Sequence, residues 1–136
     1  MNTVYLDNGQ PINPLGSAWV DFGLGGFLQK SDNAEWKALA GENMGKHRIP
    51  TLRNVDKRPG PGVVKAHMHN GFFKSLEDVV HFYNTRDTKT WPAPEVNQNI
   101  ENEFTGNLLL TKDEEKAIVA FMKTLSDGYV MKPGNR

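Results

Sequence analysis

The chain has 136 residues, with 16 basic and 16 acidic side chains and no cysteine. This length accommodates one domain or part of one. The balanced charge argues against nucleic acid or an anionic membrane as an obligatory partner, because both bind clustered positive charge. Without cysteine the chain forms no disulfide, thiol nucleophile or thiolate metal site.

The sequence also bears on cellular location. No stretch approaches the roughly 20 apolar residues of a transmembrane helix. The first residues show no basic region followed by an apolar run, which a signal peptide requires. We therefore expect no membrane partner and a cytoplasmic location for the chain as encoded.

The N-terminal region is rich in turn signals. Residues 1–30 are polar and include a glycine-rich run at positions 23–26, and their apolar residues follow no clean period. This pattern predicts an extended loop that wraps a core. Residues 32–40 are mostly good helix formers and predict a short helix, with Ser31 or Asp32 as its cap.

The middle of the chain predicts one clear helix. Residues 45–71 are mostly irregular, with one helical turn expected at 51–55. Residues 76–84 predict a helix capped by Ser75, because apolar side chains recur on one helical face. The members of that stripe are Leu76, Val79, Val80 and Tyr83.

The C-terminal part predicts a long loop and then a second helix. Residues 85–108 show no sustained period and predict a loop whose length is typical of functional or ligand-enclosing segments. Residues 112–126 predict a helix, because Thr111 and Glu114 match the capping-box pattern. Its predicted buried face comprises Ile118, Phe121, Met122 and Leu125.

Several side chains have more than one reading from residue type alone. The Met68 thioether is either a soft iron ligand or a core side chain. The Tyr83 hydroxyl binds either iron or a backbone carbonyl. The Arg53 guanidinium either clamps a carboxylate or lies on the surface. His67 and His69 lie two residues apart. They either bind a divalent metal or are ordinary packed and hydrogen-bonded histidines.

Three segments together carry a family resemblance. Residues 46–55 (KHRIPTLRNV), residues 66–84 (AHMHNGFFKSLEDVVHFYN) and residues 110–125 (LTKDEEKAIVAFMKTL) resemble, in order and spacing, the C-terminal haem domain of bacterial di-haem cytochrome c peroxidases and their methylamine-utilisation relatives. The resemblance implies a mainly α fold, a cytochrome c-like fragment of short helices joined by long irregular loops.

The resemblance implies roles for specific residues. Pro50, Thr51, Leu52 and Arg53 would line a haem, with Arg53 near a propionate. The turn at residues 68–71, which contains His69, would lie on the distal side. Tyr83 matches the helical position that supplies the sixth iron ligand in the methylamine branch, and Met68 is the rival candidate for that ligand.

The chain also departs from the family pattern. A c-type haem is attached through Cys-x-x-Cys-His, which a chain without cysteine lacks. These 136 residues also show no segment that we expect to correspond to the second haem domain, where peroxide chemistry occurs in the family. An insertion at residues 56–65 blurs any inherited calcium site. Peroxidase-like ancestry is therefore implied without a complete active site, and any haem would bind non-covalently or together with a partner chain.

These observations lead to two functional hypotheses. The first is a single truncated cytochrome c-like domain over residues 1–136, with a wrapping region at 1–44 and a family-like core at 45–128. Its ancestral role would be haem binding and electron transfer with a redox partner protein, in the periplasm for the intact family. The alternative is a haem-free, self-associating helical module. Self-association follows from the apolar face of helix 112–126, which lacks its family partner helix.

Overall fold

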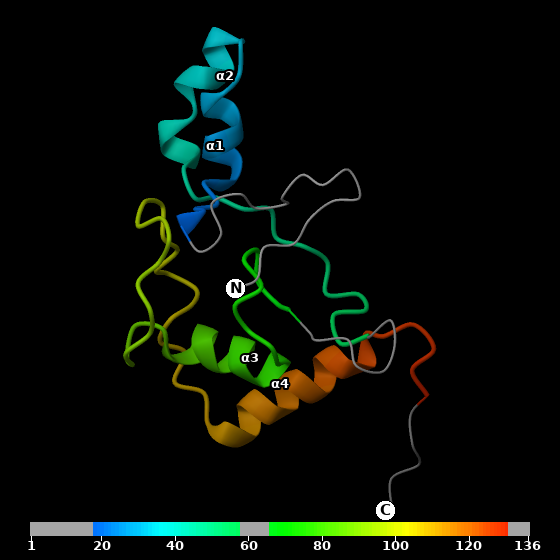
Figure 1. The fold of residues 1–136 in the computed structure, drawn as a ribbon. Coiled ribbons are helices and arrows are strands. Elements are labelled where there is room, and N and C mark those ends of the chain that lie inside the picture. Colours follow the sequence, from blue (N-terminus) through cyan, green and yellow to red (C-terminus); the bar gives the residue numbers. More distant parts are fainter. Residues whose placement is uncertain (1–17, 58–65, 131–136) are drawn as a thin grey trace, which may run out of the picture. The chain divides into compact units, whose positions relative to one another are not determined.

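The computed structural model describes residues 18–57 and 66–130 (Figure 1). The chain divides into two compact units, which we call the first unit (Met1–His47 with Ala93–Ile100) and the second unit (Arg48–Pro92 with Glu101–Arg136). Among the described residues no helix is both long and apolar enough to cross a membrane. The predicted wrapping loop before residue 18 and most of the insertion at 56–65 lie outside the described residues. The prediction of one truncated domain stays a prediction.

The first unit contains a helix that the sequence did not predict. Helix α1 (Gly23–Gln29) occupies part of the region expected to be an extended loop, so that expectation was wrong there. Glycine has low helix propensity, but here tertiary packing outweighs it. A Cβ on Gly25 would lie 2.4 Å from Met44 Cα, and one on Gly23 would lie 2.3 Å from the Lys46 carbonyl oxygen. The glycines therefore allow α1 to pack closely against the following backbone.

The second helix of this unit is close to the predicted one. Helix α2 (Ala34–Ala38) lies within the predicted range, but its N-cap is Asn33 rather than Ser31 or Asp32. The Asn33 side chain accepts hydrogen bonds from the amides of the first helical turn, and these satisfy otherwise unpaired donors. A 3₁₀ helix, η2 (Gly41–Asn43), follows directly.

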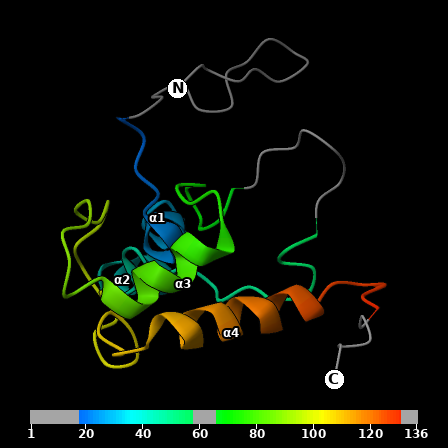
Figure 2. The ribbon, with the colours of Figure 1, turned by 90° about the horizontal axis from the view of Figure 1, so that it is seen from below.

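Two antiparallel helices form the second unit. Helix α3 (Leu76–Thr85) and helix α4 (Lys112–Thr124) lie side by side in both views (Figures 1 and 2). Lys123, near the end of α4, forms an ion pair of 3.0 Å with Glu77 at the start of α3. The predicted caps of both helices are confirmed, with Ser75 capping α3 and the Thr111–Glu114 capping box opening α4.

The core of the second unit lies between α3 and α4. It consists of Leu76, Val80, Val119 and Met122, with Val55 packed against it. The predicted buried face of α4 was partly wrong, because Ile118 and Phe121 are exposed, Phe121 to 60%. The contact with α3 runs through positions 115, 119 and 122, so the buried stripe is offset by one residue from the predicted one.

The remaining connections are irregular, as predicted. The described part of the chain contains helices, turns and one isolated bridge, between His67 and Phe73, so the fold is mainly α. The expected helical turn at 51–55 is instead a non-helical turn, because Asn54 adopts the left-handed region with a φ of 61°. Residues 86–108 form the predicted long loop.

The offset of the α4 stripe makes a stability prediction. We expect Met122→Ala to lower the free energy of unfolding by about 2–5 kcal/mol, because it removes a buried side chain. Phe121→Ala removes a larger side chain but should change stability by only about 0.5 kcal/mol, because that ring is exposed. Denaturant unfolding of both variants measures the difference. If Phe121→Ala lost more unfolding free energy than Met122→Ala, the buried face predicted from the sequence would be the correct one.

Candidate functional site

The second unit brings together the two side chains predicted to compete as iron ligands. The Tyr83 hydroxyl lies 3.9 Å from the Met68 sulfur, within reach of a weak hydrogen bond to a thioether. Both side chains are partly open to solvent, with exposed fractions of 38% and 36%. A phenol oxygen and a thioether sulfur therefore meet at one accessible point.

A tight turn presents Met68 to Tyr83. The His67 amide donates to the Phe73 carbonyl at 2.8 Å, which closes the base of the turn. The Gly71 amide donates to the Met68 carbonyl at 3.1 Å. Met68 has a φ of 67°, a left-handed conformation uncommon for a residue other than glycine. Such outliers are found most often at functional sites and are tolerated where the surrounding structure enforces them.

Aromatic rings lie beside this pair, and sequence reasoning did not find them. The Phe82 ring centroid is 5.7 Å from that of Tyr83 and 5.3 Å from those of Phe73 and Trp91. Phe73 and Trp91 lie 5.8 Å apart, nearly perpendicular to each other. These are favourable edge-to-face distances. The rings give the turn and the end of α3 an apolar support. The aromatic residues were visible in the sequence, but their convergence depends on the turn.

The residue after Tyr83 is buried and fully hydrogen-bonded. The Asn84 amide nitrogen donates to the Leu110 carbonyl at 3.0 Å and to the Glu115 carboxylate at 2.6 Å. Its oxygen accepts from the Leu110 amide at 3.0 Å. Asn84 therefore joins α3 to the segment before α4 and to α4 itself. The sequence analysis assigned it no role.

Glu115 is the charged member of this network. Its carboxylate also lies 2.9 Å from His81 Nδ1, and His81 Nε2 lies 2.9 Å from Lys89 Nζ. The Glu115 side chain is only 17% exposed. Burial acts to raise the pKa of Glu115, but the hydrogen bonds from Asn84 and His81, with the electrostatic attraction of His81 and Lys89, outweigh it and leave this pKa below its ordinary value.

The predicted haem-lining residues gather at another place in the second unit. Arg53 Nε donates to Asp127 at 3.0 Å, and the Asn54 amide group donates to the same carboxylate at 3.0 Å. These hydrogen bonds, from Asn54 first and then from Arg53, lower the pKa of Asp127. An open depression of about 460 Å³ adjoins them, lined by Thr51, Leu52, Arg53, Thr124, Leu125, Ser126 and Asp127.

The predicted site residues thus form two groups in the second unit. Tyr83 precedes Asn84, which bonds to Glu115 in the first turn of α4, whereas Arg53 bonds just beyond the other end of α4. From position 115 to 124 a helix rises about 14 Å. Pro50 and His69 are exposed and lie outside both sets of contacts described above. The structure therefore pairs Met68 with Tyr83 and groups Thr51 with Leu52 and Arg53.

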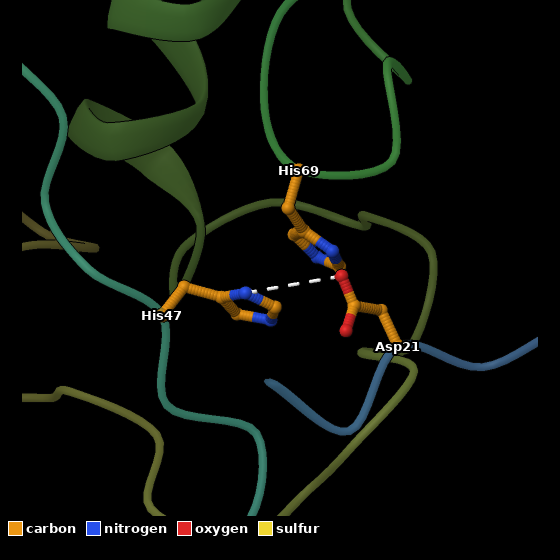
Figure 3. A group of neighbouring side chains, drawn as sticks. All are labelled: Asp21, His47 and His69. Atoms are coloured by element: carbon orange, nitrogen blue, oxygen red, sulfur yellow. Dashed lines mark ion pairs between the residues drawn. The ribbon is translucent and has the colours of Figure 1, made fainter. Parts of the chain in front are cut away.

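The first unit holds a separate polar pair. His47 Nδ1 lies 3.8 Å from an Asp21 carboxylate oxygen (Figure 3). The other Asp21 oxygen accepts from the Gly23 amide at 2.9 Å, where α1 begins. This pair connects the start of α1 to the backbone that follows η2, and sequence reasoning did not predict it.

Two known proteins are similar to the chain. The methylamine utilization protein MauG of Paracoccus denitrificans (strain Pd 1222) is 30% identical over 146 aligned positions, which cover 93% of this chain and 34% of MauG. The cytochrome-c peroxidase IdrP1 of Denitromonas iodatirespirans is 38% identical over 85 residues, which cover 62% of this chain and 19% of IdrP1.

The homology is therefore partial. The chain spans about a third of MauG and a fifth of IdrP1. No protein-family model matches it, and no solved structure does. At this low identity the chain is partly homologous to MauG and to a cytochrome c peroxidase, as the three-segment resemblance predicted.

The lowered pKa of Glu115 makes a pH prediction. Because this pKa lies below its ordinary value of 4.5 in the folded chain, the ionised carboxylate stabilises the fold above that value. The stabilisation is lost as the pH falls through the folded pKa. We expect Glu115→Gln to cost about 1–2 kcal/mol at pH 7 and to flatten the decline of unfolding free energy below about pH 5.

Denaturant unfolding across this pH range measures the effect. Asp113→Asn, which removes an exposed carboxylate from the same helical turn, is the matched control and should keep the wild-type decline. An unchanged decline in Glu115→Gln would mean that the carboxylate network does not stabilise the native state.

Proposed function

We propose that this chain supplies the sixth-ligand part of a cytochrome c-like haem domain, with an ancestral role in electron transfer. The observation that carries the proposal is the contact between the Tyr83 hydroxyl and the Met68 sulfur, 3.9 Å apart at the end of α3. Partial homology to a protein named cytochrome-c peroxidase and to MauG supports the same reading.

The donor set suits one axial side of a haem. Tyrosine oxygen and methionine sulfur are both known haem ligands, and they favour different potentials. The Phe82 ring lies 5.7 Å from that of Tyr83 and 5.3 Å from that of Phe73, and a haem face needs such apolar surroundings. The sequence contains no cysteine, so this chain would supply no covalent anchor for a haem and no Cys-x-x-Cys-His histidine as an iron ligand. Haem would therefore bind non-covalently or with an anchor from a partner chain.

The residues of this chain would have distinct roles toward the haem. Bound haem supplies one-electron transfer through its iron. Tyr83 would offer its phenol oxygen as the ligand, with Met68 as the alternative donor. Arg53 lies in the other group, near the far end of α4. Its contact with Asp127 uses only Nε among the described residues and leaves the terminal NH₂ groups as donors, so it would attract a propionate that reached that end of the helix.

A haemin titration tests the proposal. We expect saturable binding with a shifted Soret band in the wild-type chain. Outer-shell partners of metal ligands are already worth 10–100-fold in affinity, so Tyr83→Phe should weaken binding by about tenfold or more and remove the phenolate-to-iron absorption. Met68→Leu should keep that absorption.

Tyr129→Phe is the matched control, because it removes a partly exposed hydroxyl elsewhere in the second unit. It should leave both affinity and spectrum unchanged. Absence of saturable haemin binding would reject non-covalent haem binding by this chain. Loss of the spectrum in Met68→Leu alone would instead make Met68 the ligand.

A second candidate function rests on the exposed face of α4. Ile118 and Phe121 lie one turn apart and are both exposed, although both are large and apolar. Their outward position favours a haem-free interaction role, in which this face covers its counterpart on a second copy of the chain. In this alternative the chain is a self-associating helical module.

Sedimentation velocity over a range of concentrations tests this alternative. Self-association predicts that the average mass of the wild-type chain rises with concentration. Phe121→Glu should raise the dissociation constant by about tenfold or more, because a charge would enter an apolar contact. Lys116→Glu, an exposed change on the same helix, is the control. A monomer at every concentration would reject self-association.

A further inference from the structure

We propose that Asn84 is a positioning residue that holds Tyr83 beside Met68. The inference rests on the proposed function in one respect only, namely that Tyr83 is the ligand. The inference goes beyond the proposed function because it names Asn84 as the residue that determines the position of the Tyr83 hydroxyl oxygen. The argument starts from a contrast between two consecutive residues of α3, one buried and saturated with hydrogen bonds, the other partly exposed and weakly held.

Asn84 is held on all sides. It is 6% exposed, and both amide hydrogens and the amide oxygen have partners at 2.6–3.0 Å in Leu110 and Glu115. Both donors of the amide are therefore used, and its oxygen accepts one hydrogen bond. Because a buried amide without partners is costly, alternative positions of this side chain are unfavourable. The last turn of α3 is thereby fixed at this residue.

The backbone around Tyr83 continues the same attachment. The Gly106 amide donates to the Tyr83 carbonyl at 2.7 Å, and the Leu108 amide donates to the Asn84 carbonyl at 3.2 Å. With the side-chain bonds from Asn84 to Leu110, the segment 106–110 is attached to α3 at alternate residues. Tyr83 therefore lies within the attached turn rather than at a free helix end.

Gly106 fits this segment closely. Its φ is 103°, a conformation that favours glycine, and a Cβ there would lie 2.1 Å from an Asp87 carboxylate oxygen. The Asp87 amide donates to the Gly106 carbonyl at 2.9 Å, and Arg86 pairs with the Asp87 carboxylate at 2.8 Å. Segment 106–110 and the end of α3 therefore both donate and accept backbone hydrogen bonds across their contact.

The Tyr83 side chain is held much less firmly. Among the described residues its hydroxyl contacts only the Met68 sulfur, a weak acceptor, and the ring is 38% exposed. A phenol held so weakly takes its direction mainly from its backbone. We infer that loosening Asn84 moves the Tyr83 hydroxyl away from Met68 even though Asn84 touches neither group.

The test uses the methyl signal of Met68 in the haem-free protein. Methyl-labelled methionine NMR reports the ring-current shift that Tyr83 imposes on the Met68 methyl group. Met68→Leu identifies the signal, and Tyr83→Leu gives its position without the ring. We expect Asn84→Ala to move the signal more than half of the way to that position. Val119→Ala, a core change between the same helices, is the stability control and should leave it in place.

A second variant keeps the test decisive if Asn84→Ala does not fold. Asn84→Ser keeps a small hydroxyl that can donate and accept and adds no charge beside the Glu115 carboxylate, so it should give a smaller shift in the same direction. Methyl signals that respond no more than those of Val119→Ala would overturn the proposal, because Asn84 would then be a general stabilising residue.

Haemin separates this inference from the function on which it rests. Asn84→Ala should weaken haemin binding by about tenfold and reduce the phenolate-to-iron absorption, whereas Val119→Ala should keep that absorption. If wild-type protein binds no haemin but the methyl signal moves as expected, the proposed function fails while the positioning role of Asn84 stands. Full phenolate absorption in Asn84→Ala would overturn the positioning role.

Discussion

The hydrogen bonds of the buried Asn84 side chain are the constraint on which the second unit depends. They join the end of α3 to a stretch of chain 26 to 31 residues further along, because Asn84 contacts both Leu110 and Glu115. Below this point α3 and α4 share a small apolar core of four side chains. So small a core is sensitive to the loss of any buried partner. The polar contacts at one end and the apolar contacts along the helices therefore act together in setting how α3 lies on α4.

This arrangement separates the proposed iron donors from the covalent attachment of a haem. The conspicuous feature is the phenol and thioether pair formed by Tyr83 and Met68, which needs both a fixed end of α3 and a tight turn before it. Neither requirement involves the covalent anchor of a cytochrome. Under the proposed function, a chain without cysteine would therefore still offer this pair of donors to a haem iron. The electron-transfer role follows only if haem is supplied to that side.

The sequence predicted the parts of the fold that local chemistry determines. Ser75 and Thr111 predicted where α3 and α4 begin, because capping depends on neighbouring residues. It missed α1, because glycines that favour turns locally are required there for close packing. It also missed Asn84, since a polar residue in a helix gives no sign of burial until its distant partners are known. Met68 and Tyr83 were candidates by residue type, the family resemblance made them rivals for one ligand position, and their contact needed the structure.

Hydrogen exchange of the backbone amides in segment 106–110 tests the central claim most directly. The amides of Gly106, Leu108 and Leu110 donate to Tyr83 and Asn84, whereas those of Asn107 and Leu109 have no acceptor among the described residues. The account predicts alternating protection, with Leu110 as slow as the amides of α3 and Asn107 near the rate of an open loop. Uniformly fast exchange across the segment would contradict it, because the end of α3 would then be free and Tyr83 would have no fixed direction.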